Sequence, residues 1–158
     1  MKKIVLLTLF VALVTLHSPA KALASGYVGG GAGLLELSGG GITGSTLAES
    51  IFAGYKFGGA LGLGAFYQFK TGYSNMGGSV DFYPGGKMFY IGPRVGETTL
   101  VIISGLNYGA GAGVNIPVGQ ALSLGVDASY MTGSLSVLGV SVGTISAINV
   151  AANLKFWM

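Results

Sequence analysis

The feature that most constrains the fold is a two-residue alternation on both sides of a Gly-Gly pair. Residues 51–57 and 61–69 flank Gly58-Gly59, and every second residue in each arm is apolar or aromatic. The residues between them are three glycines, Lys56, Gln68 and two phenylalanines, Phe52 and Phe66. Alternation of this period around a Gly-Gly pair is typical of a β-hairpin. A strand with one apolar face and one small or polar face suits a position between lipid and a narrow polar lumen.

The same alternation recurs along the rest of the chain and predicts eight strands. They are expected at residues 26–38, 47–57, 61–69, 79–83, 87–95, 103–118, 122–131 and 143–158. The longer connections are expected at residues 39–46, 72–78, 97–101 and 132–141. A strand that crosses a membrane needs about 9–11 residues, so the chain length accommodates eight crossings. The pattern leaves open the facing of the first strand and the register of residues 74–104, where Pro93 weakens the strand.

The N-terminus has the organisation of a secretory signal peptide. Two lysines follow the initiating Met, and residues 4–16 form a run of apolar residues and Thr. Small residues, Ala22 and Ala24, occupy the positions that a signal peptidase reads, so cleavage is expected before Ser25. The apolar run is too short to span a bilayer, which disfavours the alternative of a retained membrane helix. The expected division is a signal peptide, residues 1–24, and an outer-membrane β-barrel domain, residues 25–158.

The remaining composition narrows the class of protein. Three of the eight basic residues lie in the signal peptide, so the rest of the chain carries five basic and five acidic residues and no net charge. The net positive charge of the full chain therefore does not indicate a nucleic-acid partner. The chain has no cysteine, which excludes disulfides and thiolate metal sites. After residue 24 no apolar run approaches the ~18 residues of a transmembrane helix. An exported apolar chain of this kind can satisfy its backbone in a membrane as a closed β-barrel.

The two alternating sets of side chains, one apolar and one small or polar, must face opposite sides of the barrel wall. A soluble lipocalin-like barrel would bury the apolar phase. The other phase is too rich in Gly, Asn and Ser to line an apolar ligand pocket, but it can fill an eight-stranded lumen, which has room only for side chains. We therefore expect an all-β, eight-stranded antiparallel up-and-down transmembrane barrel. The residues expected to point into its lumen are Lys56, Gln68, Lys70, Asp81, Arg94, Asp127 and Lys155. The residues expected in two interfacial aromatic girdles are Tyr55, Phe57, Tyr67, Phe69, Tyr108, Tyr130 and Phe156.

Charges inside a barrel need partners, because an unpaired buried charge costs several kcal/mol. Asp81 and Arg94 stand on either side of the turn at Pro84 and could face each other. Asp127 and Lys155 belong to neighbouring strands, although Lys155 lies near the rim. We interpret these charges as structural groups that fill the lumen and fix the register. The alternative is that they gate ions.

Four segments resemble the small outer-membrane barrels related to the OmpA transmembrane domain and to OmpX. They are FAGYKFGGALGLGAFYQF, VDFYPGGKMFYIGPRVG, YGAGAGVNIPVGQALSLGVDASYM and NVAANLKFWM. The resemblance implies an eight-stranded barrel in the bacterial outer membrane, with long turns outside and short turns in the periplasm. It also implies insertion by the barrel assembly machinery, which reads the last strand. Family chains usually end on an aromatic residue, whereas here Phe156 precedes Trp157 and Met158. We expect a monomer among outer-membrane lipids.

The sequence argues against catalysis. Outer-membrane barrel enzymes rely on a histidine for proton transfer near neutral pH, and the only histidine here is His17, inside the signal peptide. Serines have no evident activating base, and Asp81 and Asp127 are expected on distant strands. The GAGAG run at residues 109–113 resembles a dinucleotide-binding motif, but no helix follows it. We therefore expect no catalytic, cofactor-binding or metal-binding residues.

Three functions remain compatible with this interpretation. The leading hypothesis is a structural, non-catalytic role in the outer membrane. The first alternative is a small pore or conduit for ions or apolar molecules, which needs an open lumen. The second is a surface-exposed adhesion or binding protein, which needs long loops or strand extensions. The expected loops are short and nearly uncharged, which disfavours this second alternative.

Overall fold

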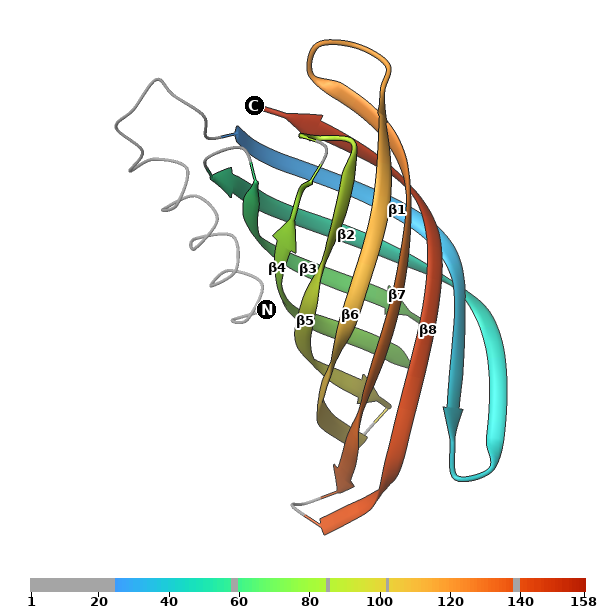
Figure 1. Ribbon diagram of the computed structural model, residues 1–158. Helices are drawn as coiled ribbons and strands as arrows, with labels where there is room; N and C mark the ends of the chain where they lie inside the picture. Colours follow the sequence, from blue (N-terminus) through green and yellow to red (C-terminus); the bar gives the residue numbers. More distant parts are fainter. Residues whose placement is uncertain (1–24, 58–59, 85, 102, 138–139) are drawn as a thin grey trace.

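The computed structural model describes residues 25–57, 60–84, 86–101, 103–137 and 140–158, which form a closed barrel of eight antiparallel strands (Figure 1). The strands are β1 Ser25–Gly39, β2 Ile42–Phe57, β3 Leu61–Lys70, β4 Tyr73–Phe82, β5 Phe89–Leu100, β6 Ile103–Pro117, β7 Leu122–Val137 and β8 Val140–Trp157. Each strand pairs with its neighbours in sequence, and β8 pairs with β1 to close the barrel. Ser25 begins β1, whereas the expected signal peptide with Ala22 and Ala24 lies outside the described residues. No helix in the described part of the chain is long and apolar enough to cross a membrane.

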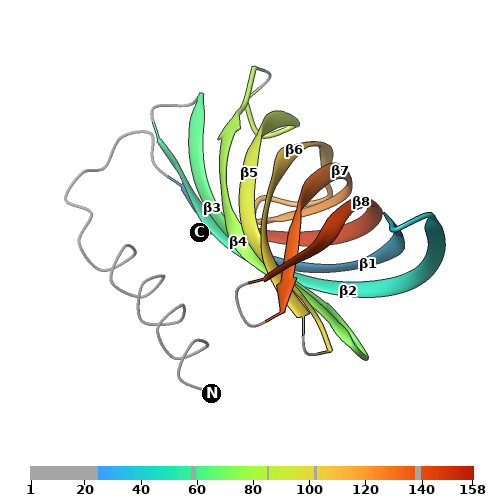
Figure 2. The same cartoon turned by 90° about the horizontal axis from the view of Figure 1, so that it is seen from below.

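The strands close with a definite stagger. Following partner residues from Tyr27 on β1 through every strand leads back to β1 at Leu37, 10 residues further along. With eight strands, a shear of this size tilts the strands by about 40° to the barrel axis. The tilted strands form one closed ring, which Figure 2 shows from below.

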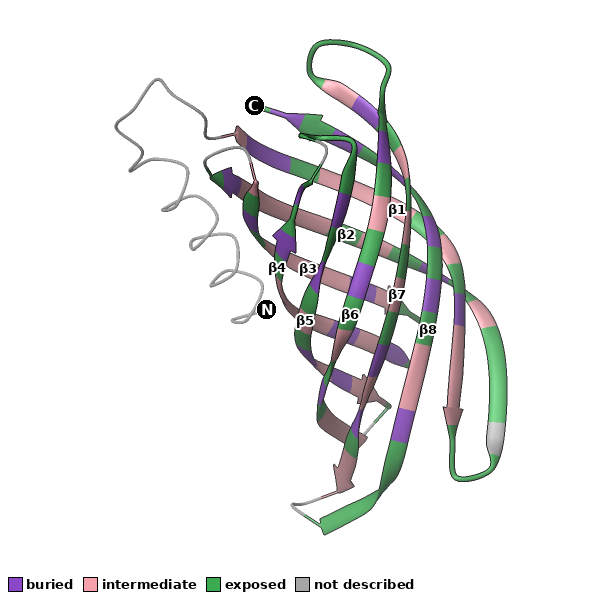
Figure 3. Ribbon diagram, viewed as in Figure 1, coloured by how far each residue is buried: buried purple, intermediate pink, exposed green. Residues whose placement is uncertain are grey.

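The apolar phase of the alternation faces outward, and the small and polar phase faces the lumen. Large apolar residues such as Ile51, Leu63 and Val126 are more than half exposed on the outer surface. Polar and charged residues are buried inside, and buried and exposed positions alternate most clearly along β5, β6 and the second half of β8 (Figure 3). This arrangement is the reverse of a soluble barrel. It also settles the first strand, where Tyr27 and Leu35 are buried inside.

Glycine fills the lumen-facing positions that lie under large side chains. A Cβ at Gly54 would come within 2.4 Å of the Tyr27 ring, and a Cβ at Gly113 within 2.4 Å of the Tyr90 ring. An eight-stranded lumen is only wide enough for side chains to fill it. Each bulky inward residue therefore requires a very small neighbour, which explains the abundance of glycine in this phase.

The expected loops at 39–46, 72–78, 97–101 and 132–141 were wrong, because most of these residues belong to strands. At the end opposite the termini, called here the distal end, successive strands are separated by two residues each. At the end that carries the termini, called the terminal end, the separations are residues 58–60, 83–88 and 118–121. The connections at the distal end, which the proposal below places outside the cell, are the shorter ones, the reverse of the implied pattern. Small and polar residues form strand here because each has a paired neighbour, and this context overrides their turn propensity.

One distal turn shows how the chain reverses so tightly. Gly40 and Gly41 have φ angles of 59° and 81°. Both angles are positive, as a two-residue type I′ hairpin requires, and glycine adopts them without steric cost. The sequence Gly39-Gly40-Gly41 was expected to be a loop, but it is a minimal reversal between two long strands.

Candidate functional site: a lumen closed at both ends

Aromatic rings close the lumen at the terminal end. Tyr27, Tyr83, Tyr90 and Trp157 are buried together, and Phe52 packs against them. The ring centroids of Tyr27 and Trp157 are 5.3 Å apart, and those of Tyr83 and Tyr90 are 5.6 Å apart. These five residues are called the terminal plug. The rings come from β1, β2, β5 and β8 and from the segment after β4, so the closed barrel assembles the plug from distant parts of the sequence.

Three ammonium groups lie against the terminal plug. The Lys155 side chain, 2% exposed, has its Nζ atom 4.5 Å from the centroid of Tyr90 and 4.7 Å from that of Tyr27. Lys87 lies over the Trp157 ring at 4.7 Å. Lys56 lies over Tyr83 at 5.2 Å and donates a hydrogen bond to the Gly86 carbonyl. Cation–π contacts therefore help to stabilise these ammonium groups against the rings.

The surroundings of Tyr83 keep its phenol neutral. Tyr83 follows the last residue of β4 and is almost fully buried. Burial raises the pKa of Tyr83 well above that of a free tyrosine, and the nearby Asp81 carboxylate raises it further. The terminal plug therefore gains no negative charge from this residue at neutral pH.

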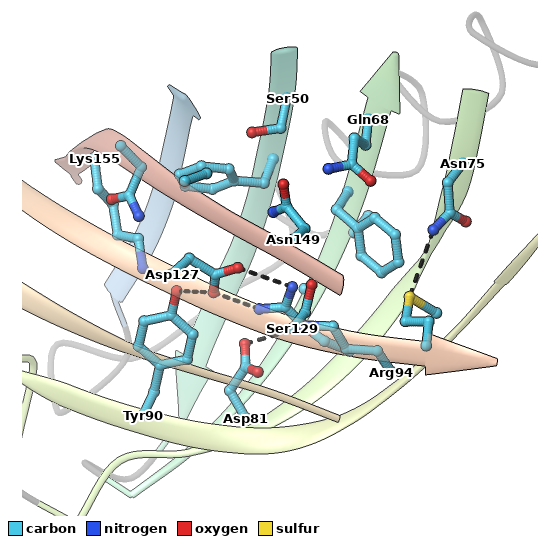
Figure 4. A pocket seen from close by; sticks show the side chains of 18 of the residues that line it. Ser50, Gln68, Asn75, Asp81, Tyr90, Arg94, Asp127, Ser129, Asn149 and Lys155 are labelled. Atoms are coloured by element: carbon cyan, nitrogen blue, oxygen red, sulfur yellow. Dashed lines mark hydrogen bonds and ion pairs between the residues drawn. The ribbon is translucent and has the colours of Figure 1, made fainter. Parts of the chain in front are cut away.

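A bidentate ion pair lies in the middle of the lumen. Arg94 Nη2 is 2.6 Å from Asp127 Oδ2, and Nη1 is 3.1 Å from Oδ1 (Figure 4). The Tyr90 hydroxyl donates to the same carboxylate at 2.5 Å. Arg94 is on β5 and Asp127 on β7, and the guanidinium crosses β6 over Gly111, where a Cβ would lie 2.3 Å from Arg94 Cζ. The GAGAG run thus provides the space that this ion pair needs.

The expected pairing of Asp81 with Arg94 was wrong. The register places Ser79, rather than Asp81, opposite Arg94. Asp81 instead accepts a hydrogen bond from the Ser79 hydroxyl at 3.0 Å and a longer one from the Tyr27 hydroxyl at 3.5 Å. Lys155 is opposite Ser123 on β7, and its ammonium lies among the aromatic rings of the terminal plug.

A small polar cavity of about 70 Å³ surrounds the ion pair. Its lining includes buried polar atoms without a protein partner, among them Asp81 Oδ1, Arg94 Nε and both side-chain polar atoms of Asn153. A water molecule needs roughly 10–15 Å³ of such space and two to four polar partners. The cavity therefore suits about five ordered water molecules.

Aliphatic side chains close the distal part of the lumen. Leu35, Ala48 and Tyr73 are buried together, with Leu37, Leu100 and Ala147 packed against them. These six residues are called the distal plug. Leu35 has no exposed surface, and the Tyr73 hydroxyl donates to Gln68 Oε1 at 3.0 Å. The terminal plug has ammonium groups over its rings, whereas no cation–π contact to the distal plug occurs among the described residues.

Two residues expected in the lumen, Gln68 and Lys70, and the expected girdle aromatics remain to be placed. Gln68 is buried inside, whereas Lys70 is exposed at the distal rim and donates to Thr46 Oγ1, so it does not belong to the charge network in the lumen. The expected girdle aromatics belong to the outward phase. Tyr55 and Phe57 lie near the terminal end with ring centroids 4.9 Å apart, and Tyr67 and Phe69 lie nearer the distal end with centroids 5.3 Å apart. Tyr108, Tyr130 and Phe156 are exposed.

Sequence reasoning missed the terminal plug. It left Tyr27 on a strand of ambiguous facing and considered Trp157 only as part of the C-terminal sequence. The available signal was the inward phase of Trp157 and Lys155, which the alternation of β8 already indicated. In the described residues no group of three or more His, Cys, Asp or Glu side chains could hold a metal ion.

Solved structures share this architecture. The crystal structure of Neisserial surface protein A matches with a TM-score of 0.63 and 19% identity, over 84% of this chain and 97% of that one. The Yersinia pestis attachment invasion locus protein Ail, in complex with the heparin analogue sucrose octasulfate, matches with a TM-score of 0.56 and 12% identity, over 85% and 100%. A scan against models of protein families and a search of curated sequences found no match. At these identities the likeness concerns the fold, and the chain has the fold of the small eight-stranded outer-membrane barrels.

Proposed function

We propose that the protein is a structural barrel of the bacterial outer membrane that does not conduct ions. The single observation that carries this proposal is an apolar exterior around a lumen that is closed by two separate plugs. The exterior suits lipid, and the girdle aromatics suit its two interfaces. Between the plugs, the ion pair links β5 to β7 and the polar cavity surrounds it.

The pore alternative is disfavoured by the same geometry. An ion entering from the terminal end would meet five packed aromatic side chains and three ammonium groups. An ion leaving at the distal end would have to pass the distal plug, in which the Tyr73 hydroxyl is the one polar side-chain group and already donates to Gln68. An apolar solute would have to cross the charged middle of the lumen.

The likeness to Ail does not bring its ligand to this chain. Sucrose octasulfate is a polyanion, and the distal half of the barrel here carries Glu36, Glu49 and Glu97 against one ammonium, that of Lys70. A sulfated sugar would be repelled by this excess of negative charge. Charge therefore gives no support to the adhesion alternative. That alternative would need the part of β2 that extends beyond its pairing with β3.

We propose an orientation and partners in line with the resemblance. Both termini would lie in the periplasm, and the barrel would be a monomer among outer-membrane lipids. The barrel assembly machinery would read β8. Phe156 is exposed on the lipid face, whereas Trp157 is buried inside, so Phe156 is the aromatic residue that the machinery would recognise. Export through residues 1–24 stays a prediction.

The test is expression of the full chain in a Gram-negative host. Membranes are separated by density, and gel mobility is compared with and without boiling. We expect the protein in the outer membrane, with a shift on boiling and no single-channel current in planar bilayers. Recovery in the soluble fraction would contradict the membrane proposal, and a steady current would favour the pore.

A further inference from the structure

A second cavity opens in the mouth of the barrel at the terminal end. It has a volume of about 250 Å³ and shares no lining residue with the polar cavity around the ion pair. Its walls come from the residues just before β5, from the connection between β6 and β7 and from the end of β8, which lie at one end of the barrel (Figure 1). This cavity is called the mouth pocket. Its lining includes Lys87, Met88, Asn115, Gly119, Ser123 and Trp157.

The mouth pocket carries positive charge that no carboxylate balances. Lys87 lines the pocket, and beside it Lys56 donates a hydrogen bond to the Gly86 carbonyl. The two ammonium groups repel each other. In the described part of the chain, neither forms an ion pair with a side-chain carboxylate or with the α-carboxylate of Met158. An anion in the pocket would offset this repulsion.

The structure holds the Lys87 cation in position. Asn115 Nδ2 donates to the Lys87 carbonyl at 3.0 Å, and the Asn115 N–H donates to the Met88 carbonyl at 2.6 Å. The Lys87 ammonium lies 4.7 Å from the centroid of the Trp157 ring, whose indole N–H donates to the Ser123 hydroxyl at 3.1 Å. A cation that is positioned before the ligand arrives lowers the entropic cost of binding.

The mouth pocket lies at the depth of lipid phosphates. Phe89 and Phe156 are exposed on the outer surface, and the residues next to them, Met88 and Trp157, line the pocket. Lys87 precedes Phe89 by two residues, so at about 3.3 Å per residue and a tilt of about 40° it lies at most about 5 Å beyond that ring. The headgroup layer extends roughly 5–8 Å beyond the hydrocarbon on each side.

The rim beside the pocket is low where β6 turns into β7. A Cβ at Gly119 would meet no atom within 4 Å, so the space over this residue is open. Gln120, next to it, is exposed and lines the pocket. Its side-chain amide has no hydrogen-bond partner among the described residues. A headgroup can therefore reach the pocket over Gly119 and accept a hydrogen bond from Gln120.

From this arrangement we propose that the mouth pocket binds the phosphate group of an anionic phospholipid in the leaflet at the terminal end. Lys87 pairs with the phosphate, Gln120 donates to it, and Lys56 adds a second positive charge. A zwitterionic headgroup would bring its own cation toward these ammonium groups, so an anionic lipid fits better. The inference rests on the membrane function proposed above and adds a lipid class and a site to it.

The fluorescence of Trp157 tests the proposal, because this residue is the only tryptophan in the chain and lies under the Lys87 ammonium. The full chain is refolded in an uncharged maltoside detergent, and a mobility shift on boiling verifies the folded barrel. Dihexanoyl phosphatidylglycerol is then titrated below its micelle concentration. We expect a saturable change in emission and NMR shifts of the Gly119 and Gln120 amides. A folded barrel without either response would overturn the lipid site alone, whereas a chain that forms no barrel would contradict the proposed function.

Matched variants locate the binding. Lys87→Gln should weaken phosphatidylglycerol binding by about fivefold, the upper range for an exposed ion pair. Gly119→Glu places a carboxylate on the open rim and should weaken binding as well. Lys70→Gln removes an exposed ammonium at the distal rim and should leave the affinity unchanged. Full affinity in Lys87→Gln, or an equal loss in Lys70→Gln, would overturn the proposal.

Two further probes identify the ligand. Dihexanoyl phosphatidylcholine has the same acyl chains and a phosphate but no net charge, and it should bind more weakly than phosphatidylglycerol. Equal binding would mean that the acyl chains alone direct the lipid to the barrel, which would overturn the proposal. Inorganic phosphate at the same concentration should also bind more weakly. An equal response to it would assign the pocket to a free anion and overturn the choice of a lipid.

Discussion

The two plugs close the same lumen by different physical means. The terminal plug uses large aromatic rings with three ammonium groups over their faces, whereas the distal plug uses mainly aliphatic side chains and no charge. Rings can accept cations on their faces, so the terminal plug tolerates lysines that a cluster like the distal one would have to exclude. The difference shows that a narrow barrel can be sealed either by polar aromatic packing or by an apolar layer.

The polar layer between the plugs should be the most sensitive part of the lumen. Arg94→Ala leaves the Asp127 carboxylate buried without its guanidinium partner, and we expect a loss of about 4 kcal/mol in the free energy of unfolding. Urea unfolding of the refolded barrel measures this loss. The double variant Arg94→Ala/Asp127→Ala should recover more than half of it. A single-variant loss below about 1 kcal/mol would mean that the ion pair does not couple the strands.

The terminal plug should depend on its largest ring. Trp157→Ala removes the ring that packs against Tyr27 and Tyr83 and the indole donor to Ser123. We expect a loss of about 3 kcal/mol in unfolding free energy. The distal plug remains closed in this variant, so no single-channel current should appear. A current from this variant alone would show that the distal plug is not a barrier.

The distal plug should respond less strongly. Leu35→Ala creates a cavity among Ala48, Tyr73 and Leu37, and we expect a loss of about 2 kcal/mol. The two plugs share no member, so this loss should add to that of Trp157→Ala within about 0.5 kcal/mol. Unfolding curves of both single variants and the double variant give the coupling. A larger coupling would contradict the independence of the two seals.

The smallest effect should come from a single cation of the terminal plug. Lys155→Met keeps much of the side-chain volume but removes the ammonium from its cage of rings, with an expected loss of about 1 kcal/mol in unfolding free energy. Lys87→Met is the matched control, since Lys87 also lies over Trp157 but is exposed. Its effect on the same unfolding measurement should be smaller. Equal effects would mean that burial adds nothing to the cation–π contacts.

The local alternation determined much of this fold. It predicted eight strands and the outward direction of girdle residues such as Tyr55 and Tyr108, because a pleated strand turns successive side chains to opposite faces. It also placed Lys56, Asp127 and Lys155 on the inner face. It overestimated the loops, since a Gly- and Ser-rich stretch such as residues 132–141 has the composition of a turn until a paired neighbour makes it a strand.

Only the tertiary structure decided which inward residues meet. Slipping a strand by two residues preserves every facing, so the pattern alone cannot separate registers that differ by that step. The closed barrel selects one shear, and this shear brings Arg94 across Gly111 to Asp127, gathers Tyr27 and Trp157 into one plug, and leaves residues 42–48 of β2 without pairing to β3. The alternation is local and can be read from the chain, whereas the shear depends on all eight pairings at once.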